Sequence, residues 1–330
     1  MENLIEKSEI LFLYESKFTI PNGDPFTGEQ RYDDETKHIL VSDVRIKRFV
    51  RDYFIEHTEK DKIIYVKNSE AIEKTGESGS AIRVNILVDE IEQNYPDLAK
   101  ELTNKYPAWK DVKKASKTKD MRKEAYALLK LCFDVRLFGG ISTKEGAAVN
   151  ITGPVQFALL NPSLNKVDLR PHQNTSVFPS KDSKKQGAMS TSSVVPYALN
   201  QIHGWINPYS AINSGLTQTD IDELFAAMWN SINNANTRSK SNQNSVLLIQ
   251  IVYSDSNDKL YGTDKLISIN SDKEEEQIRE MDDYSFDFTK LAEKASSNKI
   301  KEIRYYTEIP AIEKAITNLH NQKIQPMTLI

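Results

Sequence analysis

The chain has 330 residues, of which 39% are hydrophobic and 27% charged, and its formal net charge is −4. A single cysteine, Cys132, excludes an internal disulfide framework, and no run of about 18 apolar residues predicts a membrane span. Because the first residues also lack the pattern of a signal peptide, we expect a cytoplasmic protein with no membrane partner.

The N-terminal segments predict a strand, a loop and a helix. Residues 8–20 are β-branched, aromatic and apolar, and a turn-rich sequence follows them, which is typical of a strand. Residues 22–38 are polar and predict a loop, and residues 39–41 predict a short extended segment. Ser42 predicts the N-cap of a helix whose buried stripe contains Ile46, Phe49, Val50 and Tyr53.

The middle of the chain predicts an insertion followed by strands. Residues 61–130 are lysine-rich, with the clearest helical patterns at 82–91 and 121–132 and a polar, basic stretch between them. Residues 133–141 end in a Gly-Gly turn. Residues 147–159 predict a central strand with a bulge at Gly153-Pro154. Residues 161–193 are too polar to form a core, so they predict a protruding loop or hairpin.

The C-terminal half completes an α+β pattern. Residues 193–206 predict a strand, Thr217 or Thr219 caps an amphipathic helix, and residues 245–253 predict an apolar strand. A last helix is expected at 312–319. The order strand, helix, strand, strand, helix, strand is that of a ferredoxin-like or RRM-like fold. Such a sheet would leave one face open for RNA.

Several segments together carry a family resemblance. They are IPNGDP at 20–25 with LVSDVRIKRFVRDY at 40–53, DVRLFGG at 134–140 leading into NITGPVQF, and VVPYALNQIHGWINPYSA at 194–211 followed by GLTQTDIDELFAAMW. In their order and spacing they resemble the crRNA-binding backbone subunit of type I CRISPR Cascade complexes. This is the Cas-seven family of the RAMP superfamily, and the resemblance is greatest to its subtype I-B (Csh-type) branch.

The resemblance implies a hand-shaped molecule. The RRM-like palm would comprise residues 1–60, 130–160 and 194–330, the last range including a C-terminal extension. A helical fingers insertion would span 61–129, and a long thumb β-hairpin 161–193. Copies would stack head to tail along a crRNA, contact other Cascade subunits and expose the guide for pairing with target DNA. The resemblance implies no catalytic residue, cofactor or metal.

A basic helix carries the main site prediction. Ser42, Arg45, Lys47 and Arg48 resemble a family element, and Arg51 flanks the same helix. A helix N-terminus suits phosphate, and lysine and arginine add charge without reading sequence. The alternative is a surface helix with solvated cations. Other basic residues gather at 110–123 and 181–185, and acidic ones at 272–283.

The remaining RNA-binding candidates rest on the resemblance. Gly139 and Gly140 resemble a glycine turn near the RNA, with a plain β-turn as the alternative. Arg238, Lys240, Asn242 and Gln243 lie where family members carry a basic RNA-contacting loop, although the segment could equally be an exposed connector. Phe178 and Met189 are candidates for a thumb side chain that wedges between bases, against a disordered loop. Asn22 recurs in the resemblance and predicts a structural turn, with a metal role as the alternative.

The rival from another class is a metal-dependent endoribonuclease that uses Asp24, Asp33 or Asp34. Related type III backbone subunits cleave target RNA with a loop aspartate, and Asp33 and Asp34 form a carboxylate pair near the expected RNA path. The Csh-type resemblance argues against cleavage. The histidines have no metal-ligand spacing, and HExxH and GxSxG motifs are absent. A small-molecule enzyme with an RRM-like core is a third alternative.

Overall fold

A computed structural model describes residues 5–57, 62–67, 79–175 and 189–330. Its main sheet has the strand order β14-β13-β10-β1-β9-β6, in which β1 (Ser8–Thr19) pairs antiparallel with both β9 (Met189–Ile206) and β10 (Gln243–Tyr253). At the edges lie β6 (Val155–Phe157) and the pair β13 (Ile300–Tyr306) and β14 (Ile324–Pro326). The predicted α+β class and the three long strands are confirmed.

Two helices cover one face of this sheet. Alternate residues of β1, Ile10, Phe12 and Tyr14, are buried beneath α1 (Asp43–His57) and α8 (Gln218–Asn233). Of the two threonines predicted as the N-cap of α8, Thr217 is the cap, and it exchanges hydrogen bonds with Asp220 in a capping box. In α1 the buried stripe continues to Phe54, and Tyr53 is only half-buried, so the predicted stripe is wrong by one residue there.

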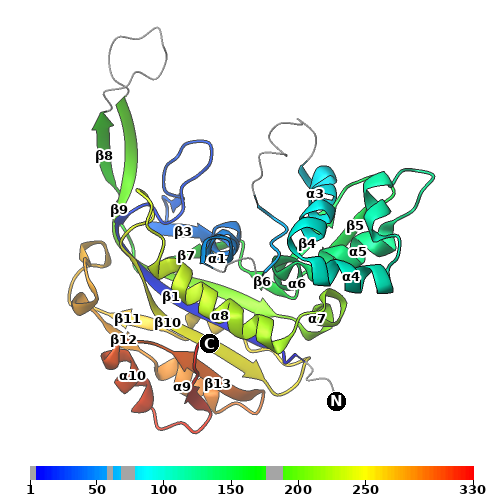
Figure 1. The fold of residues 1–330 in the computed structure, drawn as a ribbon. Helices are drawn as coiled ribbons and strands as arrows, with labels where there is room; N and C mark the ends of the chain where they lie inside the picture. Colours follow the sequence, from blue (N-terminus) through cyan, green and yellow to red (C-terminus); the bar gives the residue numbers. More distant parts are fainter. Residues whose placement is uncertain (1–4, 58–61, 68–78, 176–188) are drawn as a thin grey trace.

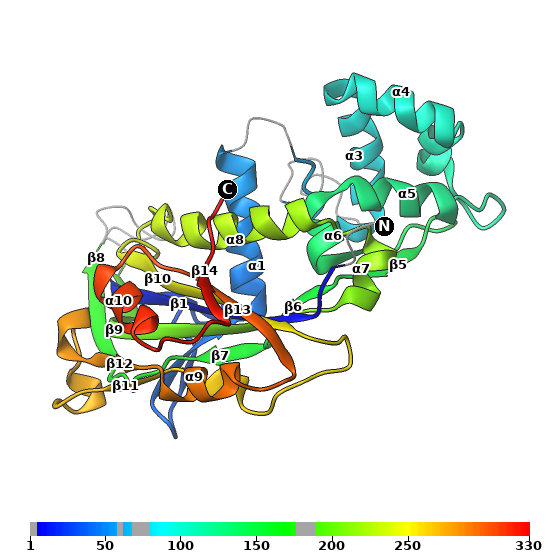
Figure 2. The ribbon, with the colours of Figure 1, turned by 90° about the horizontal axis from the view of Figure 1, so that it is seen from below.

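The opposite face of the sheet is not open, which corrects the sequence prediction. Leu11 and Leu13 point to this side and are fully buried against residues of the C-terminal segment, among them Leu266, Phe288 and Leu291. Figure 2 shows α1 and α8 on one side of the sheet and α9 (Thr289–Ala295) on the other. Because β1 and β10 are apolar on both faces, each face requires a covering layer.

The C-terminal segment contains several short elements. It begins after β10 and contains η2 (Thr263–Lys265), β11 (Ser268–Asn270), η3 (Glu275–Gln277), η4 (Met281–Asp283), β12 (Ser285–Asp287) and α10 (Pro310–Thr317). The expected last helix is therefore confirmed. No helix in the described ranges is long and apolar enough to cross a membrane.

The predicted central strand at 147–159 is wrong. The segment forms two short strands, β5 (Val149–Thr152) and β6, in different sheets, and β6 is an edge strand. The turn at Gly153 separates them, and a Cβ there would lie 2.0 Å from the Phe138 carbonyl carbon. Before it, α6 (Phe133–Phe138) ends at Gly139, and β4 (Gly139–Ser142) pairs with β5.

A helical lobe comprises residues 79–131 and is labelled α3 to α5 in Figure 1. Its elements are α3 (Gly79–Asn94), α4 (Pro96–Lys105), η1 (Trp109–Lys114) and α5 (Arg122–Leu131). They enclose a core of their own around Leu87, Trp109 and Leu128. The two predicted helices are confirmed, but the stretch between them is not all polar loop, because Trp109 and Val112 are fully buried.

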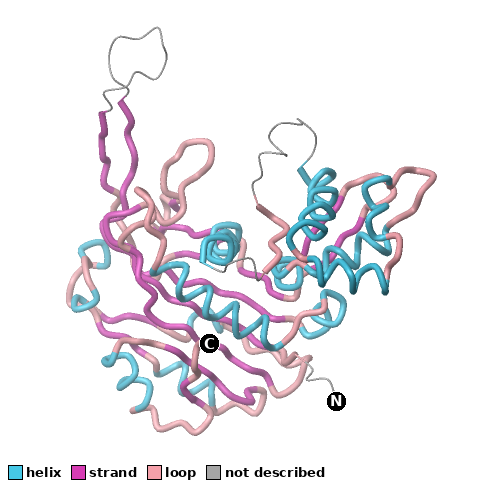
Figure 3. Tube along the Cα trace, viewed as in Figure 1, coloured by secondary structure: helices cyan, strands magenta, loops and turns pink. Residues whose placement is uncertain are grey.

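A β-hairpin projects from one end of the sheet, at the left in Figures 1 and 3. Its described arms are β8 (Arg170–Thr175) and residues 189–194 of β9. Residues before the hairpin do contribute to a core, contrary to the prediction: Val167 packs with Ile39, Val195 and Ala198. Here β7 (Leu160–Pro162) pairs with β3 (His38–Ser42), which pairs with β2 (Tyr32–Asp33).

Candidate nucleic-acid interface

The loop after β1 is fastened to the start of α1 by one side chain. The Oδ1 atom of Asn22 accepts hydrogen bonds from the backbone N–H of Ser42 (2.7 Å) and from its hydroxyl (2.8 Å). Ser42 Oγ in turn accepts a 3.4 Å hydrogen bond from Arg45 N–H, which is the predicted N-cap contact. Asn22 is itself buried, and its N–H donates to Gln30. These contacts give Asn22 the structural role that the sequence predicted.

Arg45 is a half-buried cation without a carboxylate partner among the described residues. Its guanidinium lies 3.7 Å above the Phe49 ring, and its Nε is buried without a hydrogen-bond acceptor. Burial lowers the pKa of Arg45, and nearby Tyr14 and Asp52 oppose that effect. A buried charge that lacks a counterion is energetically unfavourable, so an anion bound at this position would be stabilised.

The other three cations of α1 are paired. Lys47 lies between Asp43 Oδ2 and Gln156 Oε1, at 3.1 Å from each. The Nε of Arg51 donates a 2.8 Å hydrogen bond to Asp134 Oδ2, and only 11% of the Arg51 side chain is exposed. Arg48 pairs with Asp52 at 2.6 Å but is exposed.

These ion pairs divide the predicted RNA-binding residues of α1 into two groups. Asp134 also accepts hydrogen bonds from the N–H groups of Tyr65 and Val66, so Arg51 helps to join α1 to the segment that leads into the helical lobe. Lys47 and Arg51 therefore have structural partners. Ser42, Arg45 and Arg48 line a depression of about 510 Å³ with Asn22 and Leu159.

Lys240 lies close to Arg45 in space, although the two residues are 195 positions apart. Its ammonium donates to the carbonyl of Ile20, and no carboxylate among the described residues pairs with it. Burial, with the Arg45 charge as a second cause, lowers the pKa of Lys240 to about 8. Gln243, the first residue of β10, is buried and donates to the Lys240 carbonyl, whereas Asn242 at the end of the loop is exposed with φ 55°.

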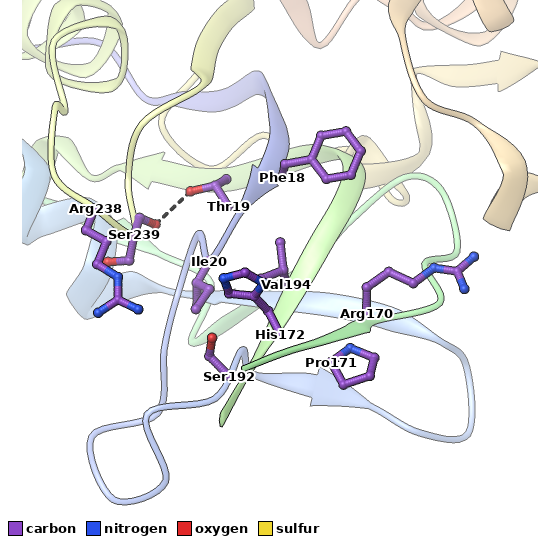
Figure 4. A pocket seen from close by; sticks show the side chains of 10 residues that line it. All are labelled: Phe18, Thr19, Ile20, Arg170, Pro171, His172, Ser192, Val194, Arg238 and Ser239. Atoms are coloured by element: carbon purple, nitrogen blue, oxygen red, sulfur yellow. Dashed lines mark hydrogen bonds between the residues drawn. The ribbon is translucent and has the colours of Figure 1, made fainter. Parts of the chain in front are cut away.

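A second cavity of about 640 Å³, which we call the hairpin pocket, lies where β1 ends against the hairpin. It is lined by residues of β1 and the following turn, of both hairpin arms and of the 234–242 loop, all drawn in Figure 4: Phe18, Thr19, Ile20, Arg170, Pro171, His172, Ser192, Val194, Arg238 and Ser239. Arg170 and Arg238 are exposed and lie on opposite sides of the pocket. Neither has an ion-pair partner within the part of the chain that the structure describes.

The two depressions are neighbours. Asn22 lines the first and Ile20 the second, and the Ile20 carbonyl holds the Lys240 ammonium near Arg45. We call Arg45, Lys240, Arg238 and Arg170 the cationic surface. Three of its members were predicted from the sequence. Arg170 was missed, because a lone arginine in a polar segment carries no signal of its own and only strand pairing brings it here.

The two predicted glycines are explained by packing inside the protein. Gly139 has φ 84°, and a Cβ would lie 2.3 Å from the Ile151 carbonyl oxygen. A Cβ on Gly140 would lie 2.9 Å from a methyl group of Val135. The segment is the end of a helix and the start of a strand, so it is not the plain β-turn that was the alternative, and the predicted RNA contact of the two glycines stays a prediction.

The structure does not describe the side chains of the two predicted wedge residues. Phe178 lies outside the described residues, and of Met189 only the backbone is described, paired with Thr175 in the hairpin. Their predicted role stays a prediction.

Two of the three aspartates of the rival nuclease prediction, Asp24 and Asp33, accept hydrogen bonds within turns, and the third, Asp34, is exposed. Asp24 accepts a hydrogen bond from Phe26 N–H and pairs with Arg31, and Asp33 accepts hydrogen bonds from Thr36 Oγ1 and Glu35 N–H. These hydrogen bonds lower the pKa of both carboxyl groups. Within the described ranges no three histidine, cysteine, aspartate or glutamate side chains are grouped to hold a metal ion.

Comparisons with known proteins agree on one family. The sequence model of "CRISPR-associated protein Cas7" matches residues 6–289. A relative from Haloferax volcanii, "CRISPR-associated protein Cas7", is 26% identical over 310 residues, which covers 88% of this chain and 82% of the relative.

Two solved structures are also similar. A chain of a "CRISPR RNA-guided surveillance complex, pre-nicking" has a TM-score of 0.46 and 16% identity, over 78% of this chain and 83% of that one. A chain of a "CRISPR RNA-guided surveillance complex" has a TM-score of 0.49 and 13% identity, over 97% and 94%. Because the family match extends over most of the sequence, the chain belongs to the Cas7 family of CRISPR-associated proteins.

Proposed function

We propose that the chain is a non-catalytic, crRNA-binding backbone subunit of a type I CRISPR interference (Cascade) complex. The observation that carries the proposal is the cationic surface, in which four basic side chains from three separate segments have no carboxylate partner among the described residues. Phosphate oxygens would supply the missing negative charge. Contacts of this kind do not read base sequence, which suits a subunit that must hold many different guides.

Family membership supports the finer assignment. We propose the sheet with α1 and α8 as an RRM-like palm, because β10-β1-β9-β6 with two helices on one face has the ferredoxin-like order. The helical lobe would be the fingers and the hairpin the thumb. Copies would assemble head to tail along the guide, together with other Cascade subunits, and present it to target DNA. The subtype I-B assignment rests on the sequence resemblance.

We propose a narrower set of RNA contacts than the sequence predicted. Arg45, Arg238 and Lys240 stay in it, and Arg170 joins them. Lys47 and Arg51 leave it, because their partners are within the protein. Gly139 and Gly140 leave it because close packing within the protein accounts for both glycines.

The direct test is guide binding by a charge-reversed protein. The double variant Arg170→Glu with Arg238→Glu should weaken binding to two guides of unrelated sequence by the same factor, measured by fluorescence anisotropy. Both side chains are exposed and unpaired, so the fold should tolerate the change. The matched control is Lys294→Glu with Lys314→Glu, on the helices α9 and α10. Unchanged binding, or a loss confined to one guide, would refute the proposal.

A further inference from the structure

Phe18 has an unusual backbone conformation at the edge of the hairpin pocket. Its φ is 50°, in the left-handed region that bulky side chains rarely adopt. The residue is 60% exposed, and it belongs to none of the apolar clusters formed by the described residues. The ring therefore contributes little to the stability of the fold, while its backbone is strained.

The neighbouring residues hold Phe18 in this conformation. On one side, Lys17 N–H donates to the Asn242 carbonyl at 3.0 Å. On the other side, the Thr19 hydroxyl and the Ile20 N–H both donate to the Ser239 carbonyl, at 2.7 and 3.1 Å. Because both flanks are fixed to the 234–242 loop, the backbone of Phe18 cannot relax by rotating. Glycine or asparagine would adopt the same φ with less strain, so the phenyl ring has no evident structural reason to be there.

The surroundings of the ring define what it could bind. The hairpin pocket brings together this exposed ring and the unpaired guanidinium groups of Arg170 and Arg238. Figure 4 shows the ring at one edge of the pocket, with one arginine on each side of the pocket, and the strand register places Phe18 between the pairs Lys17–Tyr197 and Thr19–Val195 of β1 and β9. A flat apolar ring and two cations around one pocket are complementary to a flat aromatic group attached to phosphates.

We propose that Phe18 is the stacking platform for one nucleobase of the bound RNA, and that Arg170 and Arg238 hold the phosphates on either side of that base. This inference rests on the proposed function, and it adds a contact that depends on a base rather than on the sugar-phosphate chain. Because every nucleobase has an aromatic face, the contact is independent of sequence. The strained backbone of Phe18 fixes the ring at the pocket before RNA arrives.

The test compares two short, fluorescently labelled ligands with the full-length protein: an oligouridylate, and the same ribose-phosphate chain without bases. The wild type should bind the oligouridylate about 5- to 150-fold more tightly, the range expected for stacking of one base. Phe18→Asn should abolish this preference and leave the affinity for the abasic chain unchanged. Phe18→Trp should retain the preference. In contrast, Arg170→Gln with Arg238→Gln should weaken the binding of both ligands.

A stability measurement separates this role from a structural one. Because asparagine tolerates a positive φ and the ring is exposed, Phe18→Asn should unfold at a higher temperature than the wild type. Lower stability of this variant would mean that the ring supports the fold, and would overturn the proposal. So would a preference for bases that survives in Phe18→Asn, or an equal loss of affinity for both ligands. If the wild type binds neither ligand, the proposed function itself fails, which is a different result from any of these three.

Discussion

Asn22 Oδ1 accepts two hydrogen bonds from Ser42, one from its backbone N–H at 2.7 Å and one from its hydroxyl at 2.8 Å. The contact joins the loop after the central strand to the first turn of the helix that carries Arg45. Asn22→Ala would leave the Ser42 N–H without its acceptor, at a cost of about 1–3 kcal/mol. Urea denaturation should show this loss. The exposed Asn298→Ala should leave stability unchanged, and an equal effect of both variants would contradict the assignment.

Substitutions of Arg51 and Arg48, two arginines of α1, should change the free energy of unfolding by different amounts. Arg51 forms a buried pair with Asp134, so Arg51→Gln should reduce the free energy of unfolding by about 3–5 kcal/mol. Arg48 is exposed and pairs with Asp52, so Arg48→Gln should change stability by at most about 1 kcal/mol. Chemical denaturation of both variants in one buffer compares them. Similar losses would contradict the distinction between a structural and an exposed cation.

Lys240 should make guide binding depend on pH. Its pKa is lowered to about 8 in the folded protein, chiefly by burial, while in the unfolded chain the pKa is near its ordinary value of 10.5. Between these values the unfolded chain binds more protons, so this group's contribution to stability rises with pH through that window. A phosphate nearby favours the charged ammonium and raises its pKa. RNA binding near pH 8 should therefore take up protons, and affinity should fall as pH rises through this value.

Calorimetry of RNA binding in two buffers of different ionisation enthalpy measures that proton uptake. The control is Lys240→Arg, which stays charged at these pH values and should bind RNA without proton uptake. Proton uptake of the same size in this variant would assign the effect to another group and remove Lys240 from the cationic surface.

The long, regular elements could be predicted from the sequence because their apolar residues are periodic. The stripe Ile221, Leu224, Phe225, Met228 and Ile232 of α8 is buried as expected. The covered second face of the sheet could also have been expected. The run SVLLIQIVY at 245–253 is apolar at consecutive positions, which is typical of a strand buried on both faces.

The site was less predictable, because it depends on pairing between distant residues. Nothing near Arg51 in the sequence identifies Asp134 as its partner, and nothing near Arg170 indicates that pairing with β9 brings it to the same pocket as Arg238. The strained φ of Phe18 likewise arises from two neighbours that are both bonded to a loop more than 200 residues away. Local patterns predicted where cations are frequent, and tertiary contacts decided which of them are unpaired.

The most direct test of the cationic surface is the salt dependence of guide binding. For a single-stranded RNA, log K should fall linearly with log salt concentration, with a slope of about −0.7 for each phosphate neutralised. Removing two contacts with Arg45→Gln and Arg238→Gln should make the slope less negative by about 1.4. Lys294→Gln with Lys314→Gln should leave it unchanged. A slope in the Arg45 and Arg238 variant equal to that of the wild type would contradict the account.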